Sequence, residues 1–133
     1  MTYCLDTNTC IYYLNNSVPN VCKRLDEIPF RDVKIPSMVA AELLYGAEKS
    51  AKREYNYKIA STFLSLYEII DFDENAAKLY AVFRARLERT GRGIGSNDLI
   101  IAATALSHES TLVTHSIGEF SRITELRLED WVI

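Results

Sequence analysis

The chain has 133 residues, of which 48% are hydrophobic and 25% charged, and this composition excludes a disordered or fibrous protein. The length suffices for one core, so we expect residues 1–133 to form a single domain that folds without disulfides or a structural metal. The net charge of −3 excludes a uniformly basic nucleic-acid-binding surface. The charge is nevertheless segregated, because residues 84–92 hold four arginines against one glutamate, whereas residues 117–133 hold four acids against two arginines.

Three features predict a cytoplasmic protein without a membrane segment. The three cysteines, Cys4, Cys10 and Cys22, are an odd number without a Cys-x-x-Cys pair, so we interpret them as buried small apolar side chains in a reducing compartment. The amino-terminal segment has no basic leader and reaches an acid at residue 6, which argues against a signal peptide. The apolar runs are too short to span a bilayer.

Short apolar runs predict strands, and the segments between them have helical spacing. The predicted strands are residues 3–5, 33–35, 68–70 and 111–113, with a weaker one at residues 126–128. In one of the helical segments a single face collects Ala76, Leu79, Tyr80, Phe83 and Leu87. Predicted caps at helix starts are Ser37, Asp73 and Ser96, and Gly91 is typical of a helix end.

The alternation of short strands with helices predicts an α/β fold. We expect a three-layer α/β/α sandwich whose central sheet is mainly parallel, with helices on both faces. In such sheets ligands bind outside the carboxyl ends of the strands, where the strand order reverses. Polar residues at those ends are therefore the first candidates for a functional site.

Three acids occupy such positions. Asp6 directly follows the first predicted strand, and a helix is expected to begin near Thr9, which leaves Thr7 and Asn8 to hold the Asp6 carboxylate. Glu42 is a lone charge on an otherwise apolar helix after the second strand, and Asp98 opens a helix that is apolar nearly all round.

Each acid also has a structural interpretation. Asp98 is well placed to stabilise a helix start, alone or together with Ser96. Glu42 could form an ion pair with an arginine, and Asp6 could be a turn residue. Buried carboxylates otherwise need a metal or another cation, because an uncompensated charge is costly away from water.

The ordered motifs carry a family resemblance. The run LDTN with Asp6, AEL with Glu42, SNDLIIAATAL with Asp98, and VTHSIGEF followed by RI resemble the successive motifs of PIN-domain ribonucleases. Within that group the chain is most similar to the VapC toxins of bacterial type II toxin–antitoxin pairs. The similarity runs nearly from end to end of the chain.

This resemblance implies a metal-dependent endoribonuclease that uses Mg²⁺ or Mn²⁺, with Asp6 and Asp98 as metal ligands and Glu42 as a ligand or water orienter. It further implies RNA as substrate, with the anticodon loop of initiator tRNA as the leading choice. It also implies a homodimer and a cognate antitoxin whose basic segment enters the acidic pocket of a toxin–antitoxin hetero-oligomer.

The last motif departs from the family pattern. Many PIN domains have an Asp or Asn two residues after the Thr that corresponds to Thr114, whereas this chain has Ser116. A hydroxyl is a poor direct metal ligand, and Glu119 is an alternative source of a carboxylate. We favour the interpretation that Ser116 and Glu119 form a helix capping box instead.

RNA contacts are expected in the segment that precedes Asp98. The loop TGRGIG is rich in glycine, and Arg89 and Arg92 are able to grip a phosphate beside the metal. The alternative is a solvated helix end followed by a flexible connector.

Two other functions compete with the nuclease. A phosphotransfer-type α/β domain needs a late lysine, and Lys78 is the last lysine here. A non-catalytic module with an acidic pocket would bind a basic peptide and cleave no RNA. His108 and His115 are expected at a helix end and in a loop, respectively, rather than in metal-free catalysis.

Overall fold

A parallel five-stranded sheet forms the middle layer of the computed structural model, which describes residues 1–133. The strand order is β3-β2-β1-β4-β5. The strands are β1 Tyr3–Leu5, β2 Val33–Pro36, β3 Glu68–Ile70, β4 Thr111–Val113 and β5 Leu128–Glu129. The first four lie where the sequence predicts them. The fifth begins two residues late, because Leu128 pairs with Leu112 whereas Leu126 turns into the core.

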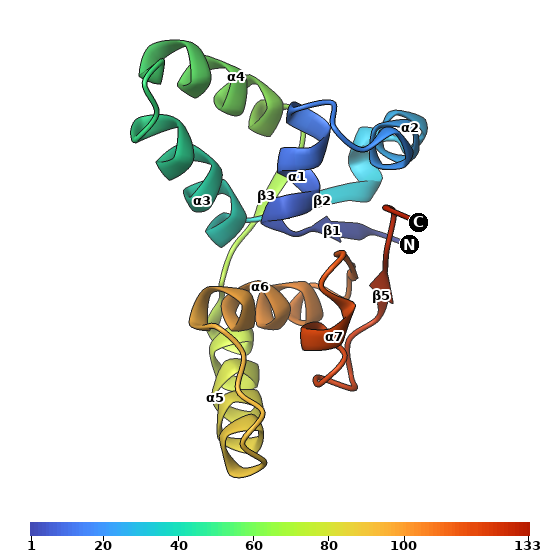
Figure 1. Ribbon diagram of the computed structural model, residues 1–133. Coiled ribbons are helices and arrows are strands. Elements are labelled where there is room, and N and C mark those ends of the chain that lie inside the picture. Colours follow the sequence, from blue (N-terminus) through green and yellow to red (C-terminus); the bar gives the residue numbers. More distant parts are fainter.

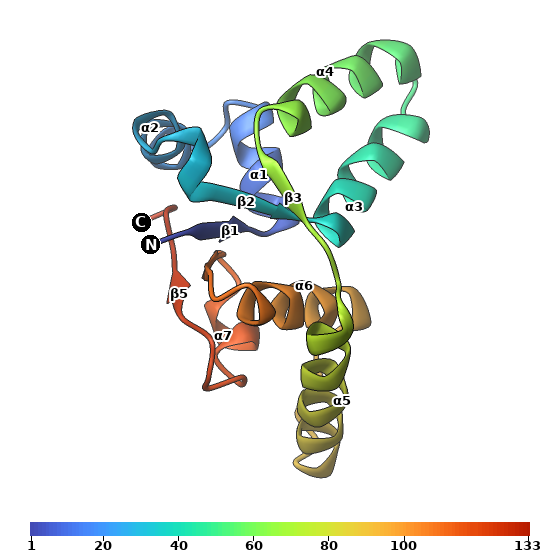
Figure 2. The same cartoon turned by 180° about the vertical axis from the view of Figure 1, so that it is seen from behind.

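Helices cover both faces of this sheet, which confirms the three-layer prediction (Figures 1 and 2). One side carries α1 Thr7–Leu14, α2 Pro19–Glu27, α3 Ser37–Glu48 and α4 Arg53–Ser65. The other side carries α5 Glu74–Arg89, α6 Ser96–Ser107 and α7 Ile117–Phe120, and a short 3-10 turn, Phe30–Asp32, precedes β2. None of these helices combines the length and apolar character needed to cross a membrane.

Helices α5 and α6 both contribute to the core. Helix α6 buries Leu99 and the run Ile101–Ala105, as its nearly uniform apolar sequence predicts, and α5 buries Ala76, Phe83 and Leu87. Cys4 and Cys10 are buried, and burial raises the pKa of both thiols. Cys22 is only half-buried, so the prediction for it is wrong, although all three cysteines are free.

The predicted caps are only partly correct. Asp73 caps α5 by accepting a hydrogen bond from the backbone N of Ala76 at 2.8 Å. Ser37 and Ser96 are instead the first residues of their helices, and neither α3 nor α6 has a side-chain cap. Gly91 follows the end of α5 with φ +67°, a conformation that glycine adopts without strain.

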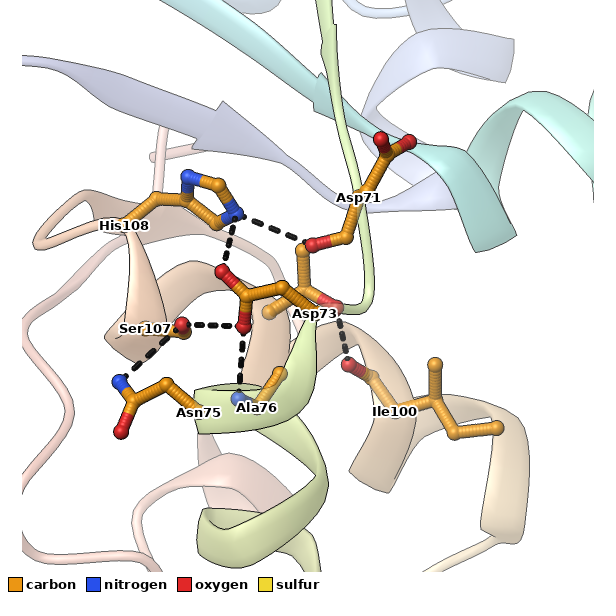
Figure 3. A network of polar contacts seen from close by, with 8 residues as sticks. Asp71, Asp73, Asn75, Ala76, Ile100, Ser107 and His108 are labelled. Carbon is orange, nitrogen blue, oxygen red and sulfur yellow. Dashed lines mark hydrogen bonds and ion pairs between the residues drawn. The ribbon is translucent and has the colours of Figure 1, made fainter.

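Asp73 also ties the start of α5 to the end of α6 (Figure 3). Ser107 Oγ donates to Asp73 Oδ1 at 2.8 Å, and His108 Nε2 lies 3.6 Å from Asp73 Oδ2 and 3.0 Å from the carbonyl oxygen of Asp71. The hydrogen bonds from Ala76 and Ser107 lower the pKa of Asp73. A single carboxylate therefore joins two helices that are separated by the loop of residues 90–95.

We expect Asp73→Ala to lower the melting temperature by about 2–4 °C at pH 7, because a cap and an interhelical contact are lost together. Asp73→Asn keeps a capping oxygen but loses the charge. Since the folded-state pKa of Asp73 is lowered, its carboxylate stabilises the fold above its unfolded pKa of about 3.9, and this contribution is lost as the pH falls further. Thermal melts at pH 7 and at about pH 2.5 should show the difference between wild type and Asp73→Asn shrinking in acid. An equal difference at both pH values would contradict this role of the charge.

Candidate active site

Asp6 lies at the point where the strand order reverses. The chain leaves β1 toward β2 on one side, while β4 lies on the other side of β1. The backbone N of Asp6 donates to the carbonyl oxygen of Val113 at 3.1 Å, which fixes Asp6 at the carboxyl ends of both strands. Its side chain is buried, with 6% of the residue exposed. This is the crevice that the α/β pattern predicts.

The partner of the Asp6 carboxylate differs from the prediction. Helix α1 begins at Thr7, and Asp6 is its N-cap, with Oδ1 accepting from the backbone N of Thr9 at 2.9 Å. Neither Thr7 nor Asn8 holds this carboxylate, so that prediction is wrong, and Asn8 is exposed. A cap uses one carboxylate oxygen and leaves the other available to a ligand.

Thr7 instead holds Glu42. Its Oγ1 donates to Glu42 Oε1 at 2.6 Å and so joins the first residue of α1 to the middle of α3. The alternative of an ion pair between Glu42 and an arginine is wrong, because none of the ion pairs in the molecule includes Glu42. The sequence signal for this contact is weak, since the two residues are 35 positions apart.

Asp98 occupies the first turn of α6 and is half-buried. Burial raises its pKa, and the negative charges of Glu119, Glu42 and Asp6 raise it further, in that order. Asp98 does not cap α6, because the N-cap residue is Gly95 and no side chain caps that helix. The structure therefore brings together four carboxylates from distant parts of the chain, which we call the acidic cluster: Asp6, Glu42, Asp98 and Glu119.

Glu119 belongs to the acidic cluster, although the sequence favours a capping role for it. Ser116 is the N-cap residue of α7, but no side-chain hydrogen bond caps this helix, so the predicted capping box is wrong. The backbone N of Ser116 donates instead to Thr114 Oγ1 at 2.9 Å, which leaves the Glu119 carboxylate without a capping role. The motif position of Glu119, three residues after Ser116, was the available signal.

No cation of the protein compensates this cluster. None of its four members takes part in an ion pair, whereas other acids of the chain do. As the side chains lie, no group of three or more potential ligands is close enough to hold one metal ion. The donors are nevertheless all carboxylate oxygens, and Mg²⁺ typically uses one or two carboxylates together with water and phosphate. In donor chemistry, although not in the present side-chain arrangement, these residues suit a hard divalent cation.

The two histidines and the last lysine of the chain have contacts outside the acidic cluster. His108 is the C-cap of α6, ten residues and therefore about 15 Å along the helix from Asp98. His115 Nδ1 lies 2.9 Å from Asp130 Oδ2, and Lys78 forms an exposed pair with Glu74 on α5. The acidic cluster thus has neither an imidazole nor a lysine as a partner.

Known proteins share this sequence and this architecture. The family model of the PIN domain matches residues 3–126. "Ribonuclease VapC2" of Rickettsia felis is 43% identical over 98% of both chains, and the "tRNA(fMet)-specific endonuclease VapC" of Salmonella typhimurium is 38% identical, also over 98% of both. The chain belongs to the PIN-domain family and, within it, to the VapC ribonucleases.

Solved structures agree with this assignment. The DNA-bound VapBC structure from Salmonella typhimurium superposes with a TM-score of 0.91 at 38% identity, over 98% of both chains. The VapBC2 structure from Rickettsia felis, bound to a DNA fragment from its promoter, gives 0.91 at 42% identity, over 98% of this chain and 99% of the other. Both neighbours are toxin–antitoxin complexes.

Proposed function

We propose that this chain is a metal-dependent endoribonuclease toxin that acts on RNA in the cytoplasm. The acidic cluster carries the proposal, because Asp6 lies at the carboxyl ends of β1 and β4, the charges of Asp6, Glu42 and Glu119 act on Asp98, and none of the four has a cationic partner. Mutual repulsion among these charges opposes folding, so the arrangement is costly unless a cation binds there. A nuclease that uses a divalent ion supplies that cation.

Asp6 and Asp98 would hold Mg²⁺ or Mn²⁺, with Glu42 as a further ligand or as the group that orients the attacking water. When bound, such an ion lowers the pKa of its water and neutralises charge on the phosphate. The protein contributes orientation. Thr9 N holds Asp6, and Thr7 Oγ1 occupies one oxygen of Glu42, which leaves the second Glu42 oxygen free to accept from water. Glu119 adds negative charge next to Asp98.

For the substrate we propose the anticodon loop of initiator tRNA, on the basis of the similarity to the tRNA(fMet)-specific endonuclease. For the partners we propose a second copy of the chain and an antitoxin, by analogy with the VapBC complexes. A basic segment of the antitoxin would inhibit by occupying the acidic cluster, since arginine and carboxylate form strong charge-assisted pairs.

The test is cleavage of total tRNA by the purified protein, followed by sequencing of the new RNA ends. We expect one dominant cut in a loop when Mg²⁺ or Mn²⁺ is present, no cut with a chelator, and recovery when the ion is restored. Cleavage that survives chelation would contradict the metal mechanism. Absence of cleavage from all RNAs with either ion would favour the non-catalytic acidic-pocket module.

A further inference from the structure

A basic pocket lies beside the carboxyl end of α5. It has a volume of about 270 Å³ and is lined by Arg86, Leu87, Thr90, Arg92, Arg122 and Thr124. The sequence predicts that Arg89 and Arg92 grip a phosphate beside the metal. In the structure Arg92 lines the pocket together with Arg86 from α5 and Arg122 from the segment after α7. Arg89 does not line the pocket.

The end of α5 sets the position of Arg92. The backbone N of Gly91 donates to the carbonyl oxygen of Glu88 at 3.1 Å, and that of Arg92 donates to Leu87 at 3.0 Å. These two bonds form a Schellman motif, which needs the left-handed backbone that Gly91 adopts. Arg92 is therefore anchored through its backbone while its exposed side chain keeps its freedom.

A second contact fixes the position of Arg122, another residue of the pocket lining. Arg122 Nη1 donates to the carbonyl oxygen of Gly93 at 3.1 Å, so the segment after α7 is fastened to the loop of residues 90–95. Arg122 Nε is buried and has no hydrogen-bond partner, the only such buried side-chain atom in the molecule. A buried donor without an acceptor costs free energy, which a bound acceptor would recover.

The pocket carries an excess of positive charge. Arg86 is neutralised by Glu125, through bonds of 2.9 Å from Nη1 and 2.8 Å from Nη2. Arg92 and Arg122 have no carboxylate partner. Two guanidinium groups with free donors suit an oxyanion, and the planar fork of arginine matches phosphate in particular.

Two short stretches of chain connect the pocket to the acidic cluster. The backbone N of Arg122 donates to the carbonyl oxygen of Glu119 at 3.2 Å, so about one helical turn separates these residues. On the other side, Asp98 follows Arg92 by six positions along the same segment. A chain of RNA whose scissile phosphate lies at the acidic cluster thus has a second phosphate site close by.

We infer that Arg92 and Arg122 bind a backbone phosphate of the RNA substrate in this pocket and so position the strand for cleavage. The inference rests on the proposed nuclease function and assigns it a phosphate site separate from the acids. Because phosphate contacts carry no base information, this site would set the register of the strand rather than the sequence preference.

The test is binding of a fluorescent single-stranded RNA in the presence of a chelator, so that binding is read without cleavage. Arg92→Ala should weaken binding about tenfold and reduce the slope of log K against log salt by about 0.7, the value for one phosphate contact on a single strand. Arg122→Lys, which keeps the charge but loses the fork, should weaken binding less. Arg31→Ala is the matched control, because Arg31 is exposed and forms no ion pair. It lies just before the amino end of β2, whereas Asp6 lies at the carboxyl ends of the strands.

An unchanged salt slope in Arg92→Ala would overturn the inference, as would an equal loss in Arg31→Ala or the absence of RNA binding by the wild-type protein. Melting temperatures of all variants control for folding. Metal-dependent cleavage by the wild-type protein is measured separately. Cleavage together with an unchanged slope rejects only the phosphate pocket, whereas a reduced slope without any cleavage rejects the proposed enzyme.

Discussion

Asp6→Asn and Asp98→Asn are each expected to reduce RNA cleavage by at least about 100-fold, because each removes a charge from the proposed metal site while preserving side-chain volume. Asp6→Asn should fold normally. Asparagine is as good an N-cap as aspartate, so the contact with Thr9 N at 2.9 Å is retained. Initial rates on one tRNA, measured over a range of Mg²⁺ and Mn²⁺ concentrations, give the size of each effect.

A suitable control is Asp32→Asn. Asp32 is half-buried and belongs to no ion pair, but it directly precedes the amino end of β2, whereas the acidic cluster lies at the carboxyl ends of the strands. This variant should cleave like the wild type. Full cleavage by both Asp6→Asn and Asp98→Asn would refute the site assignment, provided that their circular dichroism spectra match that of the wild type.

A second large effect is expected on stability. Burial and the charges of Glu119, Glu42 and Asp6 raise the pKa of Asp98 in the folded protein. A raised carboxyl pKa means that ionisation opposes folding. This cost is absent below the unfolded pKa of about 3.9 and fully present above the folded-state pKa. Without divalent ions, Asp98→Asn should therefore raise the melting temperature at pH 7 by about 3–6 °C, after allowance for solvent screening of a half-exposed group.

With Mg²⁺ the wild type should melt at a higher temperature than Asp98→Asn. An ion that binds only the folded state stabilises it by mass action, and saturating Mg²⁺ should raise the wild-type melting temperature by about 5–10 °C. Asp98→Asn, which lacks one proposed ligand, should respond much less. Differential scanning calorimetry at pH 7 and about pH 3.5, with and without Mg²⁺, measures both effects. A stabilisation by Asp98→Asn that persists in acid would point to packing instead of charge.

The four carboxylates were visible in the sequence to different degrees. Asp6 and Asp98 are recognisable because each lies between an apolar strand or helix and a turn. The local pattern alone predicts that acids at such positions lie beside the ligand-binding crevice. The sequence predicts a capping box for Glu119, because Ser-x-x-Glu satisfies that local pattern. Its contribution to the pKa of Asp98 depends on how α7 packs beside α6, which no local pattern encodes.

Local sequence patterns are enough to predict the layered α/β architecture of this protein. Hydrophobic periodicity predicts the strand positions, their alternation with helices and the apolar character of α6. This periodicity is a local property, so it can be recognised in the sequence before the fold is known. The contacts across the chain follow only from the packing of the elements: Thr7 with Glu42, Ser107 with Asp73, and Arg122 with Gly93. Such contacts depend on the directions of side chains at the ends of separate elements. From the sequence, each of these side chains could have several partners, and the packing of the elements selects one of them.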